Sequence, residues 1–155
     1  MNTEQQDAVV REVRIAAPAD LIFDYFVDPL KMIHWKGISA ELDARPGGVY
    51  RVDMNGRDVI LGEYLEIDRP RRVVMSFGWD APETLIPAGS TRVEIDLIAE
   101  GEHTIVRLTH SGLPSEAAKQ HALGWEHYLE RLSLLGAGQD PGRDPWLDAV
   151  ISDES

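Results

Sequence analysis

The sequence predicts an α+β domain in which a curved antiparallel sheet wraps around one long C-terminal helix. Three observations lead to this fold class. A strand and one or two short helices open the chain, a run of strand-like segments with turn residues between them follows, and the longest helical pattern comes last. Short turns join antiparallel neighbours, and an amphipathic helix buries its apolar stripe against the apolar face of such a sheet. We expect about six or seven strands.

The opening segment, residues 9–15, alternates apolar with charged side chains and predicts the first strand. Pro18 then favours the first turn of a helix. In residues 20–27, one helical face carries Leu21, Ile22, Tyr25 and Phe26, and Pro29 ends that pattern. Residues 30–35 predict one further helical turn.

The central region predicts six strands, because its apolar segments are separated by turns rich in glycine, proline, asparagine and aspartate. The strands are expected at residues 38–44, 49–54, 59–67, 72–79, 91–99 and 104–110. Alternation places Phe77, Trp79 and His110 on one apolar face of the sheet. Charged residues such as Arg92 and Glu94 fall on the opposite, solvated face.

The long helix is expected at residues 115–135, with Ser115 as its N-cap and a glycine as its stop. Its apolar stripe includes Trp125, with His121 and Tyr128 at the edge of the same face. This stripe should lie across the apolar side of the sheet.

Length and composition fit one domain, since 155 residues with 43% hydrophobic content support a single core. We expect this domain at residues 8–136 and a tail at 137–155 that is partly ordered or packed back. A short amphipathic segment in the tail would use Trp146, Leu147, Val150 and Ile151.

Charge and cysteine content restrict the partners and the compartment. The formal net charge of −12 repels phosphate backbones and anionic lipids, so we expect neither nucleic acid nor a membrane as a partner. The polar N-terminus lacks a signal-peptide pattern, no apolar run is long enough to span a bilayer, and there is no cysteine. We therefore expect a cytoplasmic protein.

Short motifs occur in order along residues 9–136. They are IAAP at 15–18, IFDYFVDP at 22–29 with Trp35, PGGVYR at 46–51, GEYLEIDRP at 62–70, RVVMSFGW at 72–79, TIVRLTH at 104–110 and GWEHYLERL at 124–132. Together they resemble the SRPBCC (START-like) superfamily, in the AHSA-like branch named after a chaperone ATPase activator.

The resemblance implies a helix-grip fold of the START/Bet v type. It also implies a cavity between the long helix and the sheet, which the superfamily uses for lipids, polyketides, hormones and other hydrophobic molecules. It does not imply one reaction, because a fold hosts many functions. The chaperone activator carries a further domain, so co-chaperone activity is not carried over.

The sequence contains no catalytic signature, so whether the protein is an enzyme stays open. A nucleophile elbow, a paired-histidine zinc motif, a phosphate loop and a dinucleotide fingerprint are all absent. The five histidines form no pair at i and i+4, and we expect neither a metal nor another cofactor.

His110 and Glu63 are the candidate acid–base residues. An inward-facing His110 could move a proton, or it could be hydrogen-bonded to backbone at the strand end. If Leu61 and Leu65 face inward with Glu63, burial raises the pKa of its carboxyl. If Tyr64 faces inward instead, Glu63 is an ordinary surface residue.

The candidate ligand-binding residues are aromatic or carry a polar group near the helix. They are Trp35, Phe77, Trp79, His110, His121, Trp125 and Tyr128. Trp35 and Trp79 lie near loops and are expected at the pocket mouth, whereas Trp125 also suits core packing. His121 and Tyr128 either present polar groups into the cavity or lie at the helix–sheet seam.

The leading functional hypothesis is a binding domain, monomeric or homodimeric, that encloses a hydrophobic or aromatic small molecule between the sheet and the long helix. One alternative is a cyclase-like or dehydratase-like enzyme that uses the same cavity. A second alternative is a protein-interaction or stress-related accessory module.

Overall fold

The structure is a computed structural model that describes residues 6–148 of the chain. Its elements in order are β1 (Gln6–Ile15), α1 (Ala19–Val27), α2 (Pro29–Met32), β2 (Ser39–Leu42), β3 (Val49–Asp53), β4 (Val59–Asp68), β5 (Arg72–Phe77), β6 (Thr91–Glu100), β7 (His103–Pro114), α3 (Ser115–Gly136) and the 3-10 helix η1 (Pro145–Asp148).

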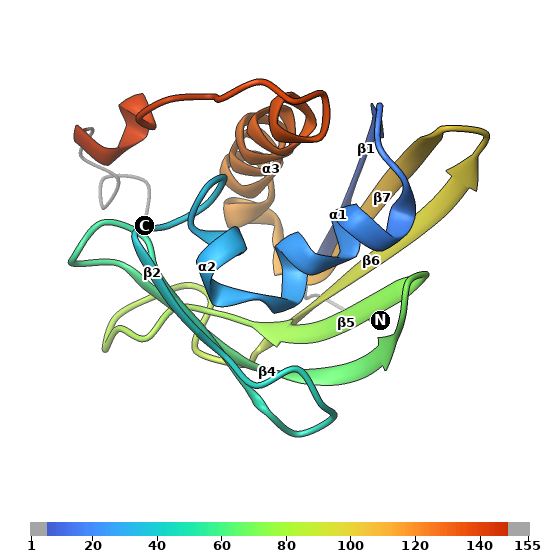
Figure 1. Cartoon of the computed structure of the whole chain (residues 1–155). Coiled ribbons are helices and arrows are strands. Elements are labelled where there is room, and N and C mark those ends of the chain that lie inside the picture. The colour runs from blue at the N-terminus through green and yellow to red at the C-terminus, as the bar shows by residue number, and fades with distance from the viewer. Residues whose placement is uncertain (1–5, 149–155) are drawn as a thin grey trace.

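All strands belong to one antiparallel sheet with the order β1-β7-β6-β5-β4-β3-β2. Strands β2 to β7 follow one another as a meander, and β1 pairs with β7 at the far side. Figure 1 shows α3 on the concave side of this curved sheet, with α1 and α2 on the same side. The predicted α+β helix-grip fold is confirmed, including the short helices after the first strand.

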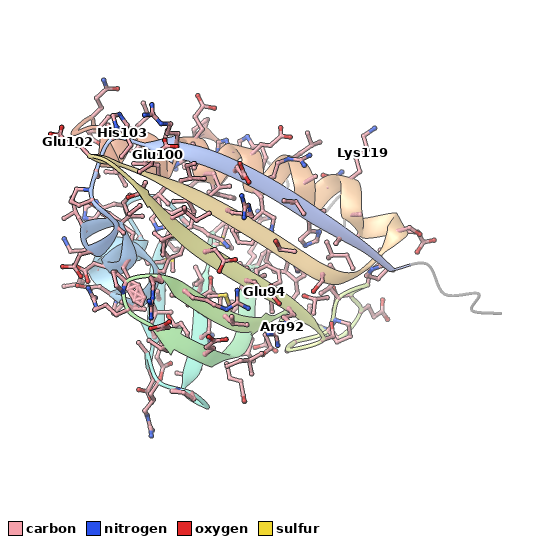
Figure 2. The ribbon with its side chains drawn as sticks, turned by 90° about the vertical axis from the view of Figure 1, so that its right-hand side faces the viewer. Arg92, Glu94, Glu100, Glu102, His103 and Lys119 are labelled. Carbon is pink, nitrogen blue, oxygen red and sulfur yellow. The ribbon has the colours of Figure 1, made fainter. Side chains whose placement is uncertain are left out.

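The two faces of the sheet have opposite chemistry. Met75, Ile95 and Leu108 on the concave face are almost fully buried. The convex face carries charges, and Arg92 and Glu94 lie there side by side in Figure 2, joined by an ion pair of 2.7 Å. This confirms the alternation expected from the sequence, and it directs the apolar face toward α3.

Two local expectations are wrong. Ser115 is the first residue of α3 and does not cap it; Pro114 holds the N-cap position without a side-chain hydrogen bond, because β7 continues directly into the helix. The strand expected at 72–79 ends at Phe77, and Trp79 instead bridges Ile60 and Pro87 separately. The loop between β5 and β6 therefore begins early, and its residues line a pocket together with residues of α3.

The segment after α3 returns to the helix. In η1, the indole of Trp146 stacks on the imidazole of His127, with ring centres 3.9 Å apart and planes 1° from parallel. Asp144 accepts a hydrogen bond from the Trp146 backbone and lies 2.7 Å from His127 Nε2. The expected contributions of Val150 and Ile151 lie outside the described residues. Within residues 6–148, no helix combines the length and apolar character needed to cross a bilayer.

Candidate functional site

A pocket of about 320 Å³ lies between the first half of α3 and the sheet. Its walls come from α3, the β3–β4 turn with the start of β4, the loop between β5 and β6, and η1. Met54, Ile60 and Ile86 give it buried aliphatic surface. Exposed residues such as Leu85 and Gln120 form the rim, so the pocket opens to solvent.

Aromatic rings form the inner part of this pocket. Phe77 lies between Trp79 and Trp125, with ring centres 6.1 and 5.9 Å away, and His121 lies 6.1 Å from Phe77. Tyr128, one helical turn after Trp125, also lines the pocket. Phe77 meets the rings of Trp79 and His121 edge to face and the ring of Trp125 at a tilt of 50°, which gives the inner wall a broad apolar aromatic surface.

His121 is fixed in orientation by two hydrogen bonds. The Trp79 indole donates to His121 Nε2 at 3.3 Å, so Nδ1 carries the proton and donates to the Ala117 carbonyl at 3.0 Å. Burial lowers the pKa of His121. Neutral His121 therefore holds the Trp79 indole next to α3 by accepting its hydrogen bond.

His110 lies behind the pocket wall and is fully enclosed. Trp125 Nε1 donates to its Nδ1 at 3.0 Å, and Thr91 Oγ1 lies 2.8 Å from its Nε2. Because the Thr91 hydroxyl donates to the Phe77 carbonyl, His110 Nε2 carries the proton. Burial lowers the pKa of His110 to about 2, with His121 and Lys36 adding smaller effects. Both ring nitrogens are occupied, so His110 orients Trp125 and has no free site for proton transfer.

Lys36 is the functional candidate that the sequence interpretation missed. Its side chain lines the pocket, although the residue is only 3% exposed. The Lys36 Nζ lies 4.0 Å from the Trp125 ring centre, with the rings of Phe77 and Tyr128 at 5.3 and 5.9 Å. A lysine between aromatic rings has no sequence signature, because the rings come from β5 and α3.

No ion pair or hydrogen bond joins Lys36 Nζ to any of the described residues. Burial lowers its pKa from 10.5 to about 7. A lysine enclosed by apolar surface loses hydration and so holds its proton weakly. Lys36 is therefore a mixture of amine and ammonium at neutral pH.

Gly37 sets the position of Lys36. The backbone at Gly37 has φ of +88°, and a Cβ there would lie 2.6 Å from Val52 Cγ1. Lys36 is also tied back by its backbone hydrogen bond to the Met32 carbonyl at 3.0 Å. The chain thus turns sharply from α2 into β2, leaving the Lys36 side chain inside.

We expect Gly37→Ala to lower the free energy of unfolding by about 2 kcal/mol. Alanine is strained at this positive φ, and its Cβ would also collide with the Val52 side chain. Urea unfolding followed by circular dichroism measures this loss. Gly138→Ala is the matched control, since Gly138 also has positive φ but open space around it. Equal losses in both variants would mean that the contact with Val52 contributes nothing.

Two sequence-predicted residues lie elsewhere. Trp35 is buried in the core, where its indole donates to the Tyr25 carbonyl at 3.0 Å and its ring packs on Phe26, so its expected place at the pocket mouth is wrong. Glu63 is exposed on the convex face because Tyr64 takes the inward position. The interpretation of Glu63 as a buried general base is therefore wrong, and the surface alternative holds.

The structure brings together Phe77, Trp79, His121, Trp125 and Tyr128 in the pocket, with His110 directly behind Trp125. Across residues 6–148, no cluster of three or more histidine, aspartate or glutamate side chains is arranged to hold a metal ion. The site is thus an aromatic pocket whose lysine, Lys36, forms no ion pair with the part of the chain that the structure describes.

Comparisons with known proteins agree on the fold. The family described as "Activator of Hsp90 ATPase homolog 1-like protein" matches residues 16–136. A solution structure of an AHSA1-like protein from Rhizobium etli is 43% identical, with a TM-score of 0.71, and the alignment covers 92% of this chain and 89% of that one. No match was found among the curated proteins.

Two more distant structures share the fold alone. CalU16 from Micromonospora echinospora is 22% identical with a TM-score of 0.68, covering 99% of this chain and 94% of that one. An HSP90 activator from Plasmodium falciparum is also 22% identical, with a TM-score of 0.67, covering 83% and 94%.

Proposed function

Because this chain belongs to the Activator of Hsp90 ATPase homolog 1-like family, we propose that it uses the cavity of the helix-grip fold to bind a hydrophobic or aromatic small molecule. The observation that carries the proposal is the pocket between α3 and the sheet, open at its rim and lined by aromatic rings. Its volume lies at the small end of the range for ligand sites. We therefore propose a ligand of one or two rings.

The arrangement of the walls supports a planar ligand. Trp79 and Trp125 contact the same pocket, and both have their indole N–H groups occupied by histidines. The rings therefore present apolar surface rather than hydrogen-bond donors, and the binding energy would come from burial of the ligand's apolar area. The likeness to an HSP90 activator, at 22% identity, supports no chaperone role here.

Gly124 offers a direct test, because it lines the pocket and a Cβ there would meet no atom within 4 Å. We expect Gly124→Phe to fill the pocket and to weaken binding of 2-naphthalenemethanol by about tenfold or more, as measured by calorimetric titration. The fold should remain, because phenylalanine has a higher helix propensity than glycine in the interior of a helix.

Gly124→Ala is the matched control. It should retain binding and raise the free energy of unfolding by about 1 kcal/mol through helix propensity. A natively folded Gly124→Phe protein that binds the alcohol as well as the unchanged protein does would place the ligand elsewhere and would refute the proposed pocket.

A further inference from the structure

Lys36 is a buried basic group in the wall of an apolar pocket, and within residues 6–148 it has no ion-pair partner. Buried lysines that serve only the fold are normally paired with a carboxylate, since an isolated buried charge is expensive. Here the Trp125 ring centre lies 4.0 Å from Nζ. Among the carboxylates that line the pocket, Asp58 is half-buried and Asp80 and Glu83 are exposed. Burial of the Lys36 amine therefore brings the fold no stabilising ion pair among the described residues.

We propose that Lys36 is a nucleophile that forms an imine with an aldehyde or ketone group of a hydrophobic ligand. The inference rests on the proposed function, because the same pocket must first admit the ligand. It adds a substrate class, carbonyl compounds with an apolar or aromatic body, and a covalent step that nothing in the family assignment requires.

The step balances without a cofactor. The uncharged amine attacks the carbonyl carbon, a C–N bond forms, and an amine proton passes through water to the former carbonyl oxygen, giving a carbinolamine. Loss of that oxygen as one water molecule gives the C=N bond. No oxidant or reductant is consumed, and hydrolysis by water from the open rim reverses the step.

Electrostatics favour the reactive form of Lys36. Only the uncharged amine is nucleophilic, and a lysine desolvated in an apolar site reaches that form near neutral pH. The groups that face Lys36 are His110 from β7 and His121 and Tyr128 from α3, and burial keeps both histidines neutral. The lowered pKa of Lys36, about 7, agrees with this arrangement.

Three probes with the same ring system separate the alternatives. They are 2-naphthaldehyde, 2-naphthalenemethanol and 2-naphthoate, which are a carbonyl compound, a neutral alcohol and an anion. The full-length protein is incubated with each at pH 7 in the presence of cyanoborohydride, which reduces an imine to a stable amine. Intact mass and peptide mapping then locate any adduct.

We expect the aldehyde to label Lys36 about tenfold or more faster than Lys119, which is exposed and projects away from α3 in Figure 2. The alcohol should bind without labelling. Lys36→Met and Lys36→Arg should both lose the Lys36 adduct, because neither side chain forms an imine.

Two results would overturn the inference while leaving the proposed function intact. One is binding of the alcohol with no faster labelling of Lys36 than of Lys119. The other is tight binding of the naphthoate that Lys36→Met abolishes, without an aldehyde adduct, since Lys36 would then be a charge partner for an anion. Failure of all three probes to bind would instead count against the proposed function.

Discussion

Replacing Lys36 by methionine is expected to raise the free energy of unfolding by about 5 kcal/mol at pH 6. The lowered pKa, about 7 against 10.5, corresponds to this net penalty for burying the ammonium, 4.0 Å from the centre of the Trp125 ring. Methionine is unbranched and apolar, so it fills the same space without the charge.

The pH dependence gives this prediction a definite sign. The folded pKa of Lys36 lies below the unfolded value, so the unfolded chain binds more protons between pH 7 and pH 10.5. The stability of the unchanged protein therefore rises with pH across that window, and the penalty is fully present below pH 7. The advantage of Lys36→Met should shrink toward zero as the pH approaches 10.

Urea unfolding of both proteins at pH 6, 8 and 10 measures the difference. His110 and His121 are present in both proteins and burial is the largest cause of their lowered pKa in each, so only the smaller effect of the Lys36 charge on them differs between the two. A matched control is Lys31→Met, at a half-buried lysine outside the pocket. A Lys36→Met protein less stable than the unchanged one at pH 6 would show that the ammonium has a partner that stabilises it.

The fold could be predicted because its signals are local. Alternation in each strand identified the apolar face, and turn residues separated the strands of the meander. The errors fall where a contact from another element decides the structure. Trp79 leaves β5 because it bridges Ile60 and Pro87, and Ser115 does not cap α3 because β7 runs on to Pro114.

The site could be predicted only in part, because its chemistry depends on how deeply each side chain is buried and on which groups it forms hydrogen bonds with. Periodicity placed Phe77, Trp125 and Tyr128 on inward faces, which brings them to the pocket. It could not show that His110 has both ring nitrogens occupied, since the partners come from β6 and α3. Nor could it show that Lys36, a charged residue expected at the surface, is enclosed by rings far along the chain.

Replacing His110 by leucine is expected to lower the free energy of unfolding by about 3 kcal/mol at pH 7.5. The buried indole N–H of Trp125 loses the nitrogen that accepts from it at 3.0 Å, and a buried donor left without a partner costs about 2 kcal/mol. Imperfect fit of the leucine beside Phe77, whose ring centre is 4.6 Å from that of His110, adds about 1 kcal/mol. Urea unfolding measures the loss.

The same variant should lose most of this deficit in acid. The folded pKa of His110, about 2, lies below the unfolded value of 6.5, so its contribution to stability is complete above pH 6.5 and declines as the pH falls toward 2. At pH 4 the unchanged protein should have lost about 3 kcal/mol through His110, whereas leucine does not titrate. His121, whose pKa is lowered mainly by burial, titrates in both proteins, so only its smaller interaction with His110 differs between them. A stability difference between the two proteins that stays constant from pH 7.5 to pH 4 would mean that His110 accepts a proton in the folded state. That result would support the acid–base role for His110, which its hydrogen bonds with Trp125 and Thr91 argue against.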